Sequence, residues 1–265
     1  MASLSSLDLV RLVLSLASTG VYAAVGVVVG RRAVSRESLP ANRGFQFFWY
    51  SLAFLTLFTP LTYLLQDVFS AHFLAYLYIL EFLLIVIVAA IGALTYYLLY
   101  VYTGRSWVFW PVAGYHLLLL TWLMGLIASL QPYAYDPTNP ACNGGLCYHN
   151  QSSELSSSAL GLSLILPILI ATVMYFALIF RVTEPEQRRR IGMVSAALFA
   201  WFGSSLLGSI IHGTFQTASG QVQAGPLSQW VYWSYVISPL ISLTASIVIL
   251  LAYASPRRGP ESAGG

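Results

Sequence analysis

The chain has 265 residues, of which 58% are hydrophobic and only 8% are charged. A soluble domain of this length cannot hide so much apolar surface in one core, so the composition excludes a soluble globular protein and predicts an integral membrane protein. All basic side chains are arginines, the net charge is only +3, and no basic groove with interleaved aromatic residues points to nucleic acid.

Apolar runs divide the chain into seven expected helices. A hydrocarbon layer of roughly 30 Å needs about 20 helical residues to cross it, and each run is long enough. We therefore predict an all-α, polytopic bundle of seven transmembrane helices that occupies residues 1–265 as a single domain. The expected helices cover about residues 7–29, 45–65, 73–101, 108–130, 159–181, 191–212 and 229–254.

The arginines predict the orientation of this bundle, because basic residues in short loops stay on the cytoplasmic side. All but one of the twelve arginines lie after the first, third, fifth or seventh expected helix, and Arg11 is the exception. We expect the N-terminus outside, a cytoplasmic tail at residues 255–265, and a multi-pass protein of the cell membrane. The basic pair Arg31 and Arg32 follows the first run instead of preceding it, so we expect this run to be a retained helix and no cleaved signal.

Three consecutive arginines, Arg188, Arg189 and Arg190, precede the sixth expected helix. Arginines at this position are typically solvated anchors beside anionic lipid headgroups of the bilayer. The same side chains are also candidates for contact with a cytoplasmic signalling partner.

The longest connection without helical character, residues 131–158, is expected on the extracytoplasmic side. It contains both cysteines of the chain, Cys142 and Cys147, with two glycines between them. Because that compartment is oxidising, we predict a small disulfide ring. A metal site is the alternative, but two thiols near His149 are too few ligands for one. The loop either covers an outward cavity or is a long loop protected from proteases.

Glu81 is the single acid in the apolar segment LYILEFLLIVIVAA. Steps of 3.6 residues from Glu81 lead to Ile85, Val88, Gly92 and Tyr96, so the acid shares a helix face with small packing residues and is expected to face the bundle interior. Burial penalises the charged carboxylate. Glu81 is therefore either a ligand-binding or proton-sensing group, or a protonated structural acid that is hydrogen-bonded across helices.

Other polar side chains are expected near Glu81. Tyr78 lies one turn outward, and His72 and His212 lie at the outer helix ends. Together these residues predict an outward-facing cavity for a small, partly apolar ligand. The histidine pair keeps haem or metal binding as a minor alternative, although we expect no cofactor. His116, isolated in the fourth helix, is more typical of a neutral hydrogen-bonding histidine than of a metal or haem ligand.

Small residues predict where helices approach each other closely in lipid. The sixth expected helix carries such a row at steps of four residues: Gly192, Ala196, Ala200, Ser204 and Gly208. This row is expected to face a neighbouring helix.

Seven helices with an external N-terminus are similar to the rhodopsin bundle, but a retinal Schiff base requires a lysine on the last helix, and the chain has none. In such a bundle the first three and last three helices form parallel halves. Thr19 with Tyr22 in the first helix echoes Thr172 with Tyr175 in the fifth. The same plan occurs in small sugar transporters, so the echo does not distinguish a receptor from a carrier.

A second resemblance begins at YYLLYVYTGRSWVFWP, residues 96–111. This segment resembles the end of the third helix and the following turn in the seven-helix sensor modules of bacterial histidine kinases and cyclic-nucleotide signalling enzymes. The arginine-rich EPEQRRR before the sixth helix is similar to a loop of those modules. The resemblance implies a membrane sensor. Only SPRRGPESAGG follows the seventh helix, so the sensor would stand alone and signal through another protein.

The sequence shows no catalytic constellation: no paired carboxylates on one helix face, no HExxH and no phosphate-binding glycine loop. We therefore expect a non-enzymatic sensor or receptor with a small ligand near Glu81. The rival interpretation is a small-solute transporter that uses the same cavity.

Overall fold

The computed structural model describes residues 6–31, 39–130, 133–135, 148–150, 154–215 and 236–254, and these residues are almost entirely helical. The all-α class expected from the composition is confirmed for this part of the chain. In chain order the elements are α1 (Ser6–Arg31), α2 (Leu39–Leu64), α3 (Gln66–Ala71), α4 (Phe73–Thr103), the 3-10 turn η1 (Ser106–Val108), α5 (Phe109–Leu130), β1 (Tyr133–Tyr135), β2 (Tyr148–Asn150), α6 (Glu154–Ala177), the 3-10 turn η2 (Leu178–Phe180), α7 (Pro185–Phe215) and α9 (Ser238–Ala254).

Five of the described helical segments are long and apolar enough to cross a membrane. They are Leu9–Arg31, Tyr78–Thr103, Ser106–Gly125, Ser163–Phe180 and Pro185–Leu207. The 26 residues of α2 include Arg43 and Gln46 among many Tyr, Trp and Thr side chains, which lower its mean hydropathy. The described part of α9 is a shorter apolar helix of 17 residues. Crossing by all seven helices stays a prediction.

α2 and α7 begin earlier than the apolar runs predicted, and each has a proline in its first turn. α2 begins at Leu39 with Pro40 as its second residue, and α7 begins at Pro185. A proline suits the first turn of a helix, because the N–H that it lacks would have no partner within the helix there. Hydropathy alone excluded these polar first turns.

The connections around α3 and β1 also differ from the expected ones. Backbone hydrogen bonds continue through the turn after α2, from Leu65 N to Leu61 O at 2.9 Å and from Phe69 N to Leu65 O at 2.9 Å. In the connection expected to be irregular, β1 and β2 pair antiparallel, with Tyr135 opposite Tyr148. α6 starts at Glu154, inside the range assigned to that loop.

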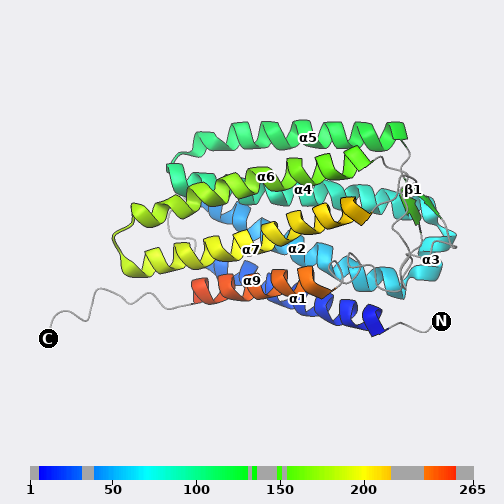
Figure 1. The fold of residues 1–265 in the computed structure, drawn as a ribbon, viewed down its shortest axis with the longest axis horizontal. Helices are drawn as coiled ribbons and strands as arrows, with labels where there is room; N and C mark the ends of the chain where they lie inside the picture. Colours follow the sequence, from blue (N-terminus) through cyan, green and yellow to red (C-terminus); the bar gives the residue numbers. More distant parts are fainter. Residues whose placement is uncertain are drawn as a thin grey trace.

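The long helices lie side by side along the long axis of the molecule, with α6, α7 and α9 over α4, α2 and α1 (Figure 1). α1 packs against α2 and α9, α4 packs against α2 and α6, and α7 packs against α6 and α9. These six helices therefore form a closed ring. α5 packs against α4 on the outside of the ring, along one edge of the bundle.

The ring consists of two halves with the same order of helices, α1, α2, α4 and then α6, α7, α9. The first helix of each half contacts the last helix of the other half: α1 contacts α9, and α6 contacts α4. Tyr22 on α1 and Tyr175 on α6 are both buried, as are Trp49 on α2 and Trp201 on α7. The two halves therefore have three helices each, and α5 links them in the chain.

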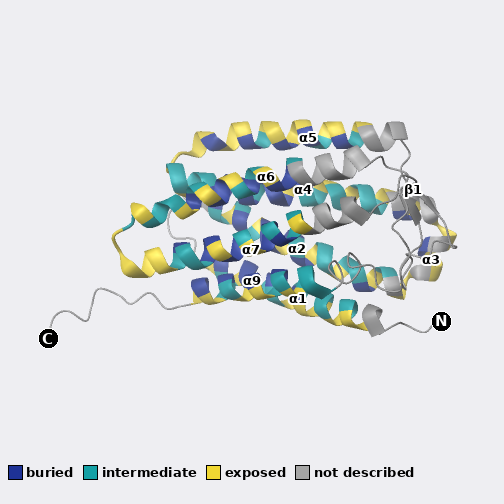
Figure 2. Ribbon diagram, viewed as in Figure 1, coloured by how far each residue is buried: buried dark blue, intermediate teal, exposed yellow. Residues whose placement is uncertain are grey.

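Aromatic rings fill the centre of the ring of helices, where Figure 2 shows the buried residues. Trp49 and Trp201 meet across the two halves with ring centroids 5.7 Å apart. Tyr22 stacks on Trp201 at 5.5 Å, and Phe48 contacts Trp49 edge to face at 5.2 Å. Such pairs contribute about 0.5–1.5 kcal/mol each beyond the area that they bury. The two halves are thus joined by a packed aromatic core.

The small-residue row of α7 does not face a neighbouring helix along its whole length as expected. Ala196 and Ala200 are exposed, although Ser204 is buried. α7 instead buries Ser195, Ala197, Leu198 and Trp201. The prediction was wrong for the two alanines, because steps of four residues exceed the 3.6-residue helical repeat and carry the row around the helix surface.

Candidate ligand groove

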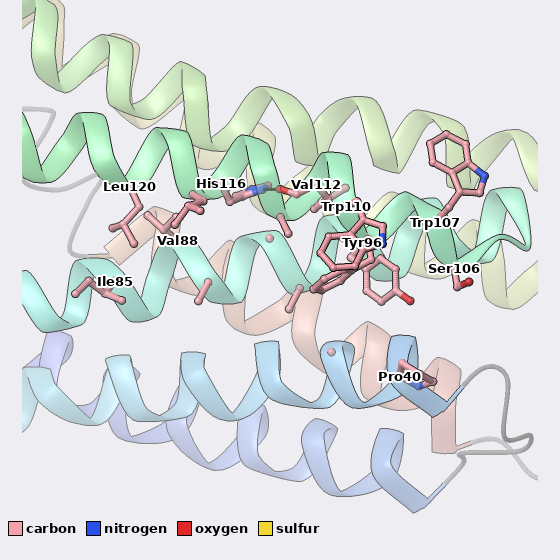
Figure 3. Close-up of a pocket in the computed structure, with 17 residues that line it drawn as sticks. Pro40, Ile85, Val88, Tyr96, Ser106, Trp107, Trp110, Val112, His116 and Leu120 are labelled. Atoms are coloured by element: carbon pink, nitrogen blue, oxygen red, sulfur yellow. Dashed lines mark hydrogen bonds between the residues drawn. The ribbon is translucent and has the colours of Figure 1, made fainter.

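A groove of about 840 Å³ runs along the outside of the bundle between α4 and α5 and reaches the first turn of α2 (Figure 3). We call it the α4/α5 groove. Its volume is in the range of small-molecule sites. The walls are mostly apolar, with Ile85 and Val88 from α4 and Val112 and Leu120 from α5.

Small residues create the space in the groove. Gly92 and Ala93 of α4 and Gly44 of α2 all line it. A Cβ atom at Gly92 would lie 3.1 Å from Cγ of His116, so a side chain at this position would press into the histidine ring. The missing side chain at Gly92 thus leaves room for the imidazole that α5 places against α4.

His116 is the buried polar side chain of the groove. It is 6% exposed, and its Nδ1 lies 2.8 Å from the carbonyl oxygen of Val112, one turn earlier on α5. Its Nε2 is buried without a hydrogen-bond partner among the described residues. A buried polar atom left unpaired costs about 1–3 kcal/mol. A ligand with one suitably placed polar group would remove this cost.

The two ends of the groove differ in character. Ile85 and Leu120 make an aliphatic end, whereas Ser106 and Trp107 lie at the other end (Figure 3). Near that second end Tyr96 meets Phe109 edge to face, with ring centroids 5.5 Å apart. Such rings give wide apolar contact at a small cost in side-chain freedom. The groove therefore suits an elongated, mostly apolar molecule.

Helical periodicity placed one face of α4 toward the bundle interior, but the residues of this face line the groove outside the ring of helices. Ile85, Val88, Gly92 and Tyr96 all contribute to it. Glu81 lies one turn before Ile85 on the same helix and is partly buried. It is not among the described residues that line the groove.

Tyr78 and His72, two of the other predicted ligand residues, lie apart from the groove. Tyr78 on α4 is 62% exposed, and His72 is exposed at the turn between α3 and α4. His212 belongs to α7, but its side chain lies outside the described residues. A site shared by Glu81, Tyr78, His72 and His212 stays a prediction.

Sequence reasoning considered His116 only as an isolated group and missed the groove around it. The available signal was a glycine on the α4 face and a lone histidine on the next helix. Spacing within one helix predicts which residues share a face. It does not predict that Gly92 and His116 lie at the same depth on neighbouring helices, because this depends on the length of the turn between α4 and α5.

The three consecutive arginines have different surroundings. Arg188 donates from Nη2 to the carbonyl oxygen of Val182 at 3.1 Å, and Arg189 is exposed. Arg190 is partly buried and donates from Nε to the carbonyl oxygen of Ala252 on α9 at 3.0 Å. Arg190 therefore joins α7 to α9, and Arg188 and Arg189 are the exposed members of the triplet.

Arg190 lies beside a buried tyrosine cluster, formed by Tyr97, Tyr175 and Tyr253. The hydroxyl oxygens of Tyr97 and Tyr253 are 2.6 Å apart, and Tyr175 also shares a hydrogen bond with Tyr253. The guanidinium of Arg190 lies 6.0 Å from the centre of the Tyr253 ring. The tyrosine cluster thus connects α4 and α6 with the last helix at this end of the bundle.

Cys142 and Cys147 lie outside the described residues, so their disulfide stays a prediction. The described strands β1 and β2 close the connection that contains them.

Comparison with protein-family models, with curated proteins and with solved structures finds no match to the chain.

Proposed function

We propose that the chain is a seven-helix integral membrane protein of the cell membrane that acts as a sensor or receptor, without enzymatic activity. In this proposal the α4/α5 groove holds a small, mostly apolar ligand. The observation that carries the proposal is that His116, whose Nε2 is buried without a partner among the described residues, lines an open, mostly apolar groove.

The arginines support the proposed orientation. Arg31, Arg43, Arg105 and Arg181 lie at helix ends that gather at one end of the bundle, together with the arginine triplet of α7 (Figure 1). Arginine-bearing ends stay on the cytoplasmic side of a membrane. The N-terminus is then extracytoplasmic and the C-terminus cytoplasmic. In this proposal α2 and α9 cross the membrane in addition to the five long apolar helices, which makes seven crossings.

The packed centre of the ring favours a receptor over a transporter. Carriers built from two parallel halves bind their substrate near the bilayer midplane, at the interface of the halves. Here Tyr22, Trp49 and Trp201 occupy that interface and contact one another. The groove described above lies instead at the side of the bundle, between α4 and α5.

Glu81, Tyr78 and His72, the polar residues expected to bind the ligand, have a secondary role in this proposal. Glu81 lies one turn beyond Ile85, at the aliphatic end of the groove. A carboxyl at this position would meet the end of a ligand longer than the groove. Tyr78 and His72 lie further toward the same end of α4.

A cytoplasmic signalling partner is the other component of the proposed sensor. Arg188 and Arg189 are exposed where α7 begins, next to the connection from η2. Two neighbouring cationic side chains at the membrane surface suit an acidic patch of a partner protein. Arg190 is not offered to a partner in the same way, because it is bonded to Ala252.

A direct test is to identify what the groove carries. The full chain is purified in detergent beside the Gly92→Ala variant, bound organic molecules are extracted, and their amounts are measured by mass spectrometry. The Cβ at position 92 would press into His116, and overpacking of this kind costs about 1–3 kcal/mol. We expect the wild type to carry one apolar molecule. The amount bound to the variant should be at least about fivefold smaller.

Gly114→Ala is the matched control, because a Cβ at Gly114 of α5 would meet nothing within 4 Å. This variant should retain the molecule at the wild-type level. Equal retention by all three proteins, or no bound molecule in any of them, would contradict the proposal.

The transporter alternative predicts a different result with the same molecule. In sealed vesicles a carrier would move it across the membrane, and Glu81→Gln would abolish the movement. A receptor binds the molecule without accumulating it in the vesicle.

A further inference from the structure

The hydrogen bond of His116 determines what its free nitrogen can do. The carbonyl oxygen of Val112 can only accept, so the Nδ1 that lies 2.8 Å from it must donate. A neutral imidazole has a single N–H, and the neutral form is the less costly one to bury in an apolar groove. Nε2 therefore carries a lone pair and needs a hydrogen-bond donor.

No described side chain supplies that donor. Tyr96, Ser106, Trp107 and Trp110 line the same groove and carry O–H or N–H groups. Nε2 of His116 has no partner among them or among the other described residues. Ser106 and Trp107 lie at the end of the groove opposite Ile85 and Leu120, and His116 lies between these two ends (Figure 3).

The open side of the groove faces outward from the bundle. Ile85 is 38% exposed and Leu117, on the facing helix, is 65% exposed, and both line the groove. In the proposed membrane orientation these side chains contact hydrocarbon. A ligand can therefore enter sideways from the bilayer, and only its single polar group has to find a partner in the groove.

We infer that the α4/α5 groove selects an apolar molecule that carries a hydroxyl group, taken from the hydrocarbon of the bilayer, whose O–H donates to Nε2 of His116. This inference rests on the proposed function of the groove as a ligand site. A ligand whose polar group only accepts hydrogen bonds, such as an ether, a ketone or a quinone, would set an oxygen lone pair against that of Nε2 and is disfavoured.

Competition between two isomers tests the inference. The full chain in detergent is loaded with tritiated 1-dodecanol, and the bound label is displaced by unlabelled 1-dodecanol or by methyl undecyl ether. The isomers have the same atoms, but only the alcohol has an O–H. We expect the alcohol to compete about tenfold more strongly, the ratio that one hydrogen bond gives.

Variants connect this ratio to the groove. In His116→Phe, which keeps a planar ring without the nitrogen, the two isomers should compete equally. Gly92→Ala should weaken binding of both, and Gly114→Ala should leave the tenfold ratio unchanged. The competition ratio measured with the unmodified chain tests the hydroxyl selectivity even if the His116 variant does not fold.

The outcomes separate this inference from the proposed function. Equal competition by the two isomers in the wild type, with loss of both in Gly92→Ala, overturns the hydroxyl selectivity and leaves the ligand groove standing. Absence of saturable binding, or identical binding to Gly92→Ala and Gly114→Ala, overturns both.

Discussion

Replacing Tyr97 or Tyr253 by phenylalanine should destabilise the arginine-bearing end of the bundle by a measurable amount. The two hydroxyl oxygens are 2.6 Å apart and both side chains are buried. Phenylalanine keeps the ring of Tyr97, which stacks on Phe45 at 4.2 Å, so the substitution removes only the hydroxyl. A net contribution of about 0.5–1.5 kcal/mol is typical of one such hydrogen bond.

The structure predicts unequal effects for the two positions. Tyr253 shares hydrogen bonds with both Tyr97 and Tyr175, so Tyr253→Phe should lower the free energy of unfolding by about 1–3 kcal/mol and Tyr97→Phe by about 1 kcal/mol. The double variant should lose less than the sum, because the second substitution removes a hydroxyl that has already lost one partner. We expect a coupling free energy of about 0.6 kcal/mol or more, the average for bonds between membrane helices.

The assay is unfolding of the purified chain in mixed micelles with increasing sodium dodecyl sulfate, followed by circular dichroism. Tyr78→Phe is the control, since this tyrosine is 62% exposed and should change the free energy by less than about 0.5 kcal/mol. Effects of Tyr97→Phe and Tyr253→Phe that add within about 0.3 kcal/mol would refute the reasoning.

Three further outcomes are expected. In the same unfolding assay Gly114→Ala should stabilise the chain by about 0.5–1 kcal/mol through helix propensity, whereas Gly92→Ala should not, because its Cβ would press into His116; equal gains would contradict the described packing. Arg190→Gln should lower the free energy of unfolding by about 1.5–3 kcal/mol through its bond to Ala252, and the exposed Arg189→Gln should leave it within about 0.5 kcal/mol. In a background without native cysteines, Arg189→Cys should react with an impermeant maleimide only after the cells are opened, and labelling of intact cells would refute the orientation.

Much of the helical structure follows from local sequence. The apolar run predicted at about 108–130 corresponds to α5, and the run at about 73–101 corresponds to α4. Helix starts were less predictable, because Pro40 and Pro185 initiate helices within polar sequence where hydropathy gives no signal. The exposed position of Ala196 also differs from the prediction, since residue size does not identify the neighbour of a helix face.

Identifying the candidate groove required both the helical periodicity of the sequence and the tertiary structure. Periodicity placed Ile85, Val88 and Gly92 on one face of α4, and the structure has these residues in one wall of the groove. The importance of His116 appears only with α5 in place, when its ring lies against Gly92 and its Nε2 is buried. The sequence does not indicate that Nε2 lacks a hydrogen-bond partner, because this depends on which side chains of other helices surround it.

The sequence by itself determined that this chain forms apolar helices and which residues share each helix face, because hydropathy and the helical repeat are properties of neighbouring residues. Only the tertiary structure decided that six helices close into a ring, that Trp49 and Trp201 fill its centre, and that open space lies between α4 and α5. Those features depend on which faces meet and at what depth. Packing across helices decides this, since it joins residues far apart in the chain.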